Sequence, residues 1–121
     1  GTMSLVGEHQ LREVTGISDS QTEAIKSFLQ GAVYCWCKNR SQEDWFSLSE
    51  LMGGENFYWE GTPLMSLYLK HEKNESENPV NQAGIDAGWL LKSVIASDLR
   101  HFETKKEFRK RMYRWCGEER T

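Results

Sequence analysis

The spacing of apolar residues changes abruptly near Asp98, and this change limits the folds open to the chain. Before it, apolar residues from Val80 to Ile95 recur at steps of three and four, as on one face of an α-helix. After it, side chains alternate in character between Phe102 and Trp115, as in strands that bury one face. The sequence therefore predicts an α+β fold that is mostly helical and ends in a β-hairpin.

Capping signals predict the two longest helices. Ser20 and Glu23 form the capping box that begins a helix, and the apolar series after them predicts a helix over residues 20–38. Asn78-Pro79 joins a capping side chain to a proline at the first helical position, which predicts a helix over residues 79–97.

Shorter signals predict the remaining elements. Trp45-Phe46 is expected to form a very short strand, and Ser47 with Glu50 repeats the capping-box spacing before a helix of one or two turns. Thr62-Pro63 begins a further helix that runs to about residue 73. In the hairpin, the charged residues 105–107 are expected to form the turn.

Close packing is expected at two places. Gly84 and Gly88 lie in the predicted helix 79–97, and we expect another element to pack closely against them. At the base of the hairpin, Phe102, Tyr113 and Trp115 are expected to be buried together, while the cationic residues project at the tip.

The length of 121 residues favours one domain, expected over residues 18–116, with a C-terminal tail at 117–121. Residues 1–17 begin with Gly1-Thr2-Met3, which is typical of a remnant of expression before a start methionine. The arm that follows is expected to be disordered, partly helical or ordered only against a partner.

Cysteine use and hydropathy predict a cytoplasmic protein without a membrane span. Cys35 and Cys37 point to different faces of one predicted helix, and Cys116 leaves the count odd, so we expect all three to be reduced. The longest wholly apolar run is a few residues, whereas a membrane span needs roughly 20.

Positive charge is concentrated at one end of an acidic chain. Residues 1–98 carry seven Lys and Arg against fourteen Asp and Glu, whereas residues 99–116 carry seven against two. The whole chain has a net charge of −3, which argues against indiscriminate coating of nucleic acid. A local patch of this density can still steer a polyanion to one face.

Three segments carry a resemblance to a known family. They are Phe46-Ser47-Leu48-Ser49-Glu50-Leu51, Gly88-Trp89-Leu90-Leu91-Lys92-Ser93-Val94-Ile95, and the pair Arg100-His101-Phe102 with Arg111-Met112-Tyr113-Arg114-Trp115. Their order over residues 20–116 resembles a winged helix-turn-helix domain with one extra helix before the last. The resemblance implies four to five helices, of which the last faces DNA, and a C-terminal hairpin that serves as the wing. The stretches 59–64 and 88–92 also look similar to small uncharacterised bacterial and mobile-element proteins.

The resemblance implies a small DNA-binding or regulatory protein. Hairpin cations are expected to contact phosphate, and polar residues of helix 79–97 are expected to face the groove of the duplex. The first set is Lys105, Lys106, Arg109, Lys110, Arg111 and Arg114, and the second is Asn81, Gln82 and Lys92. Because the polar side of that helix carries one cation and one acid, the hairpin is the main electrostatic element.

A non-enzymatic interaction module explains the same charge asymmetry. In this alternative, the basic hairpin meets an acidic protein surface, either on another protein or on a second copy in a homodimer. Lys and Arg on an edge strand also protect it from unwanted pairing with other strands.

The remaining chemical signals are weak. Trp45 and Trp89 are expected in the core, whereas Trp59, in a stretch without a period, is the tryptophan most expected to be exposed for stacking on a base. The histidines lack ligand spacing, so no metal and no cofactor are expected. The chain has no phosphate-binding glycine loop and no hydrolase motif, so we expect no enzyme, and a nuclease built from Asp86 and Asp98 with Lys92 is the minor alternative. 

Overall fold

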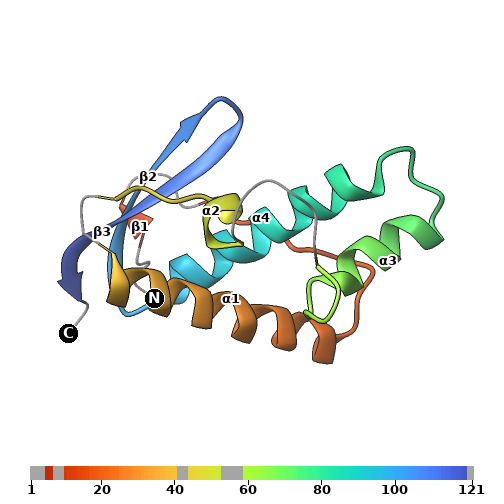
Figure 1. Ribbon diagram of the computed structural model, residues 1–121, viewed down its shortest axis with the longest axis horizontal. Coiled ribbons are helices and arrows are strands. Elements are labelled where there is room, and N and C mark those ends of the chain that lie inside the picture. The colour runs from red at the N-terminus through yellow and green to blue at the C-terminus, as the bar shows by residue number, and fades with distance from the viewer. Residues whose placement is uncertain (1–4, 7–9, 41–43, 53–58, 120–121) are drawn as a thin grey trace.

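The structure, a computed structural model, describes residues 5–6, 10–40, 44–52 and 59–119. Within this part, the fold is α+β and mostly helical, with a C-terminal antiparallel hairpin, as the sequence predicts (Figure 1). The elements in chain order are β1 (Leu5–Val6), α1 (Asp19–Asn39), α2 (Leu48–Leu51), α3 (Met65–Lys73), α4 (Pro79–Ser97), β2 (Arg100–Glu107) and β3 (Lys110–Glu119).

Helix α1 begins two residues earlier than its predicted capping box. Its N-cap is Ser18, whose hydroxyl accepts the Gln21 N–H at 3.1 Å, while the Gln21 side chain accepts the Ser18 N–H at 2.9 Å. The prediction of Ser20 was wrong because Ser18 and Gln21 have the same reciprocal chemistry. The earlier start also adds helical hydrogen bonds, such as that from the Thr22 N–H to the Ser18 carbonyl.

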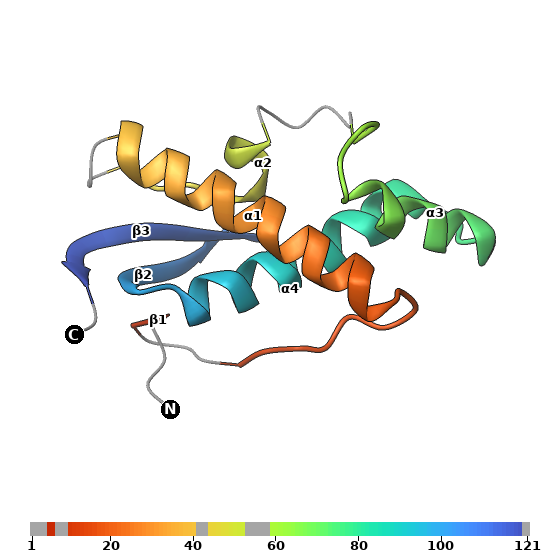
Figure 2. The same ribbon diagram turned by 90° about the horizontal axis from the view of Figure 1, so that it is seen from below.

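Helix α4 lies at the centre of the molecule and has the predicted bounds. The Asn78 side chain accepts the Asn81 N–H at 3.1 Å, and Pro79 opens the first turn. Figure 2 shows α1 crossing α4, with the segment from Gln10 to Ile17 running below them in this view. The core joins two sets of fully buried residues, Ile25, Leu29 and Val33 of α1 and Ala83, Ala87 and Ile95 of α4.

The sheet is built on the C-terminal hairpin. Strand β2 pairs antiparallel with β3 and, at its other edge, parallel with the two residues of β1. Phe46 forms a single bridge to Tyr113, with both N–H to carbonyl distances at 2.8 Å, where the sequence predicts a very short strand. Phe102 and Tyr113 are buried as predicted, and Trp115 packs against them partly buried.

The hairpin turn lies at Phe108-Arg109, so the predicted turn at 105–107 was wrong. Residues 105–107 continue β2, and Glu107 pairs directly with Lys110 across a two-residue connection. The charged composition of 105–107 resembles that of a turn. The strand pairing nevertheless continues to its end, where Glu107 faces Lys110 of opposite charge.

The N-terminal segment is ordered against the rest of the chain where the structure describes it. Val14 and Ile17 pack against the core, and the Lys70 ammonium donates to the Thr15 carbonyl at 2.7 Å. Helix α3 begins at Met65, after a tight turn in which the Thr62 hydroxyl accepts the Leu64 N–H. None of the helices in the described ranges is long and apolar enough to cross a membrane.

Candidate functional site

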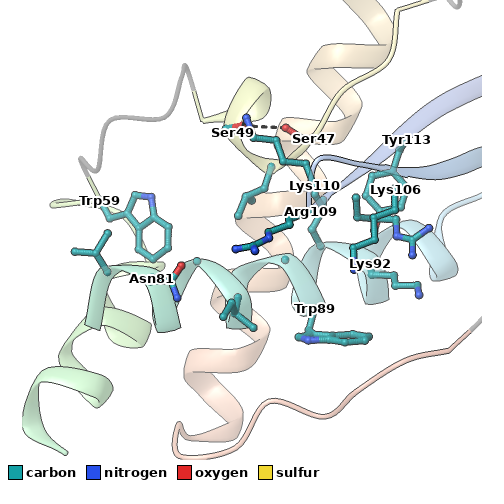
Figure 3. Close-up of a pocket in the computed structure, with 17 residues that line it drawn as sticks. Ser47, Ser49, Trp59, Asn81, Trp89, Lys92, Lys106, Arg109, Lys110 and Tyr113 are labelled. Carbon is teal, nitrogen blue, oxygen red and sulfur yellow. Dashed lines mark hydrogen bonds between the residues drawn. The ribbon is translucent and has the colours of Figure 1, made fainter. Parts of the chain in front are cut away.

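A pocket with a volume of about 730 Å³ lies between the hairpin and α4, and we call it the hairpin groove. Its floor is one side of α4, and one wall is the distal half of the hairpin. The start of α2 adjoins this wall, and Trp59 lies across from it (Figure 3). Figure 3 shows Arg109 and Lys110 reaching across the space above α4, with Trp59 on the opposite side. Polar and charged lining side chains are Ser47, Ser49, Asn81, Lys92, Lys106, Arg109, Lys110 and Arg111.

The groove is cationic although the chain is acidic. Five of its lining residues are Lys or Arg, and none of those that the structure describes is Asp or Glu. The chain as a whole has a net charge of −3. A concave surface lined by one sign of charge focuses the electrostatic potential and attracts anions.

The two-residue period of the hairpin brings two of these cations to the groove. Lys106 and Arg111 are cross-strand partners on the face that also carries Thr104 and buried Tyr113. The Arg111 guanidinium donates to the Thr104 hydroxyl at 3.3 Å, which fixes its direction along the sheet. These two cations therefore face inward because the next pair on the same face is anchored in the core.

Lys110 connects the hairpin tip to the start of α2. Its ammonium donates to the Ser49 hydroxyl at 3.4 Å. The Ser47 N–H donates to the Glu50 carboxylate at 3.0 Å, and the Ser47 hydroxyl also donates to it, so this predicted box is present. Partial burial raises the pKa of Glu50, but the Ser47 hydrogen bonds and the charge of Lys110 outweigh it and hold the pKa below its usual value.

Lys92 lies in the floor of the groove and is only 4% exposed. Its ammonium is 5.4 Å from the centroid of the Trp89 ring, and the Arg12 guanidinium lies 5.9 Å from the same centroid. The sequence predicts Lys92 on the polar side of the helix, whereas the structure buries it beneath the hairpin. Its charge contributes to the groove from below rather than from an open surface.

Two of the predicted phosphate-contacting residues lie on the other face of the hairpin. Lys105 and Arg114 stack on Trp45, with the Lys105 ammonium 4.3 Å and the Arg114 guanidinium 4.8 Å from the ring centroid. Arg114 forms an ion pair with Glu103 at 2.7 Å, and Lys105 forms one with Glu107 at 3.2 Å. The structure therefore places Lys106, Arg109, Lys110 and Arg111 together and separates Lys105 and Arg114 from them.

The exposed part of α4 supplies one of the two predicted amides to the groove. Asn81 lines it, whereas Gln82 is exposed outside it. Gly84 and Gly88 also line it, and apart from the adjacent residues and backbone of α4 itself, no atom lies within 4 Å of where a Cβ would stand on either. The prediction of close packing at these glycines was wrong, because they leave the helix surface open to the groove.

Trp59 is a wall of the groove and also a core residue. It is 8% exposed, so the prediction that it would be the exposed tryptophan was wrong. The Thr62 hydroxyl donates to the Trp59 carbonyl at 2.9 Å, and the turn that follows holds the ring against the core. Trp45 and Trp89 are half-buried and lie outside the core cluster, so the prediction that they would be core residues was wrong.

Phe108 and Arg109 form the tip of the hairpin with an unusual backbone. Their φ angles are +48° and +70°, a region that favours Gly, Asn and Asp, and a non-glycine residue there costs about 1–2 kcal/mol. The Phe108 side chain is 92% exposed. The alternating pattern after the predicted turn places Phe108 in a strand, and this prediction was wrong. The opposite charges of Glu107 and Lys110, which pair across the turn, were the signal that could have revealed it.

The predicted acidic pair of a nuclease is divided between two structural ion pairs. The Asp86 carboxylate contacts Lys70 at 2.6 Å and His71 at 2.7 Å. Asp98, about 18 Å further along α4 at 1.5 Å per residue, accepts hydrogen bonds from Gln30 and Arg100. Among the described residues, no group of three or more His, Cys, Asp or Glu is arranged to hold a metal ion.

The groove can bind an anion that also carries a flat or apolar part. Its wall offers ammonium and guanidinium donors, Asn81 and Ser49 add neutral donors and acceptors, and Trp59 offers apolar surface. Comparisons with protein-family models, with curated proteins and with solved structures found no match to this chain. Its function is therefore inferred from the chemistry of the groove.

Proposed function

We propose that this chain is a small cytoplasmic DNA-binding protein that holds the phosphate backbone of a duplex in the hairpin groove. Lys106, Arg109, Lys110 and Arg111 contact phosphate, and Asn81 faces the base edges. The observation that carries this proposal is the collection of five cations, without a carboxylate among the described lining residues, in an acidic chain. Three free cysteines agree with a reducing compartment.

A winged-helix type of fold accompanies this proposal. The order from α1 to the hairpin agrees with it, and the Phe46 bridge to Tyr113 joins the segment before α2 to the proposed wing. The N-terminal half of α4 then stands where a helix would meet the duplex, beside the hairpin. Buried Lys92 and exposed Gln82 are secondary in this arrangement, and the hairpin provides most of the electrostatic attraction.

Nucleic acid fits both chemical parts of the groove. Its backbone presents anionic phosphates, which bind Lys and Arg, and its bases present flat faces and polar edges. The groove opposes a cationic hairpin wall to Trp59, and Asn81 lies between them as an amide with both a donor and an acceptor. A groove that bound only carboxylates would need the cations, but it would not need Trp59 or Asn81.

Docking of an acidic protein surface, including that of a second copy of this chain, is the second candidate. It is favoured by the exposed apolar side chains of Val80 and Ile85, which lie beside the cations in the groove. Apolar surface of this kind suits a protein partner. This candidate predicts self-association or partner binding without affinity for DNA.

The test is a fluorescence-anisotropy titration of a mixed-sequence duplex at 50 and 200 mM salt. Four phosphate contacts predict a slope of log affinity against log salt of about −3.6, which weakens binding roughly 150-fold over this range. Neutralising the inward pair in Lys106→Gln/Arg111→Gln should reduce the magnitude of the slope by about 1.8 and weaken binding at both salt concentrations.

The hairpin itself provides a matched control. Lys105→Gln/Arg114→Gln removes the same charge from the same two strands, but from the face that contacts Trp45. This variant should retain the wild-type slope. Equal losses in both variants would show that binding follows net charge rather than the groove, and no binding at tens of micromolar protein would reject the DNA proposal.

A further inference from the structure

The tip of the hairpin presents an aromatic side chain to solvent on a constrained backbone. Phe108 is 92% exposed, and it and Arg109 have φ angles of +48° and +70°. Two-residue hairpin turns with positive φ at both positions favour Asn-Gly or Asp-Gly. Neither burial nor turn chemistry explains Phe108, and a strained residue of this kind points to a function.

The ribbon below the tip is anchored to the body of the protein. Tyr113 of β3 is buried and bridged to Phe46, and Phe102 of β2 is fully buried. On the outer face, the ion pair between Arg114 and Glu103 joins the two strands. Figure 1 shows the distal part of the hairpin ribbon extending beyond the helices, while its base is fixed in the core.

Cations flank Phe108 along the hairpin. Arg109 is its neighbour in the turn, and Lys106 and Lys110 lie two positions away on the two strands; all three line the hairpin groove. An apolar side chain flanked by Lys and Arg is the arrangement with which proteins unstack one base step and kink a duplex. The cations hold the phosphates beside the opened step.

Building on the proposed DNA binding, we infer that Phe108 is a wedge that inserts between adjacent base pairs and bends the duplex toward the hairpin groove. A bend of this direction brings more phosphates to Lys106, Lys110 and Arg111 than a straight duplex would. The ligand is therefore deformable duplex DNA, with a preference for easily unstacked steps such as TA.

A lipid surface fits the same tip less well. Phe108 is one apolar residue, whereas stable membrane attachment needs a larger apolar face or two anchoring signals. Lys106 and Arg111 line a concave pocket beneath the hairpin, where a flat bilayer surface does not reach. A duplex strand can enter such a groove.

The test uses the full chain and a duplex with 2-aminopurine beside a central TA step and a donor and acceptor dye at its ends. Wild-type protein should raise 2-aminopurine fluorescence and shorten the end-to-end distance. Phe108→Asn should abolish both responses while anisotropy still reports binding within about tenfold of wild type and with the same salt slope. Asn suits the positive φ, so this variant is expected to fold.

Two control variants test whether the responses depend on an apolar side chain at position 108 or on any exposed apolar side chain. Phe108→Leu keeps an apolar side chain and should keep both responses in part. Leu99→Asn removes another strongly exposed apolar residue, 68% exposed and located before β2 at the opposite end of the ribbon, and should change neither.

The possible contrary results distinguish failure of the wedge from failure of the proposed DNA binding. Binding by anisotropy without a fluorescence rise, or an undiminished rise with Phe108→Asn, would overturn the wedge and leave the proposed DNA binding intact. A complete absence of binding would overturn both. Sedimentation with phosphatidylserine vesicles that is lost in Phe108→Asn, without unstacking of DNA by wild type, would assign the tip to a membrane surface instead.

Discussion

Phe108 and Arg109 are residues at which local stability and the proposed function conflict. Both adopt a backbone that Asn and Gly adopt at lower cost. We predict that Phe108→Asn/Arg109→Gly raises the free energy of unfolding by about 1–2 kcal/mol, measured by urea denaturation, while DNA binding weakens. Unchanged or lower stability would show that the turn is not strained in solution.

The three cysteines should differ in reactivity because their surroundings differ. Burial raises the pKa of Cys37 to about 11; Arg100 lowers it and Asp98 raises it, both less strongly. Burial, followed by the charge of Glu103, also raises the pKa of Cys116, whereas Cys35 is exposed. A thiol reacts as its thiolate, so its reactivity falls as its pKa rises.

We therefore predict one fast thiol in the native protein at pH 8. With a chromogenic disulfide reagent, Cys35 should react first, and Cys37 should react only on unfolding. Cys35→Ser should remove the fast phase, and a fast phase that persists in this variant would contradict the burial of the other two. Because the pKa of Cys37 is higher in the folded chain, its contribution to stability is complete below pH 9 and is lost as the pH rises toward 11.

Among the elements, α4 has one side packed in the core and another side open to the hairpin groove. Gly84 and Gly88 face open space, so Ala at either position should stabilise the helix by about 0.5–1 kcal/mol. A larger side chain at the same place, in Gly88→Phe, should fill the groove and weaken DNA binding at least tenfold. Thermal unfolding and anisotropy together test both effects.

Helix α1 contains the matching control for this prediction. Gly31 is exposed, and no atom lies within 4 Å of where its Cβ would stand. Gly31→Phe should leave DNA binding unchanged because it lies outside the groove. Equal weakening by both substitutions would show that the groove is not where DNA binds.

Elements with strong local signals could be predicted from the sequence. Asn78-Pro79 and the capping box at Ser47 fix helix starts through contacts within one turn, and these were correct. The pairing of β1 with β2 depends on contacts between residues nearly 100 positions apart, which no local pattern encodes. The Phe108 turn was missed because it lacks the Gly and Asn that mark such turns.

In the whole molecule, Asp86 of α4 joins three parts of the chain, which are α4, α3 and the N-terminal segment. Its carboxylate contacts Lys70 and His71 of α3, and the Lys70 ammonium also reaches the Thr15 carbonyl. We predict that Asp86→Asn lowers the free energy of unfolding by about 2 kcal/mol, because a hydrogen-bonded, largely buried charge pair is lost. Urea denaturation beside Glu23→Gln, at an exposed site on α1, checks this, and equal stability of the two variants would contradict it.

The charge asymmetry of the molecule was visible in the sequence, but its arrangement was not. The count of cations in residues 99–116 does not tell which face of a strand each one occupies. That depends on the turn position and on the burial of Tyr113, which send Lys106 and Arg111 inward and leave Lys105 and Arg114 on Trp45. The sequence therefore predicted which residues supply the positive charge of the candidate site. Only the fold shows which of them lie on each face of the hairpin.

The location of DNA in the hairpin groove can be tested directly with the five tryptophans as reporters. Trp59 and Trp89 line the groove, whereas Trp36 contacts Phe46 and Trp45 lies on the outer face of the hairpin. The measurement is a ¹H–¹⁵N NMR titration of the indole signals with a short duplex, with assignment by single Trp→Phe variants. Shifts at Trp59 and Trp89 with unmoved Trp36 and Trp45 are the predicted result. Shifts confined to Trp45 would place DNA on the opposite face and contradict the account.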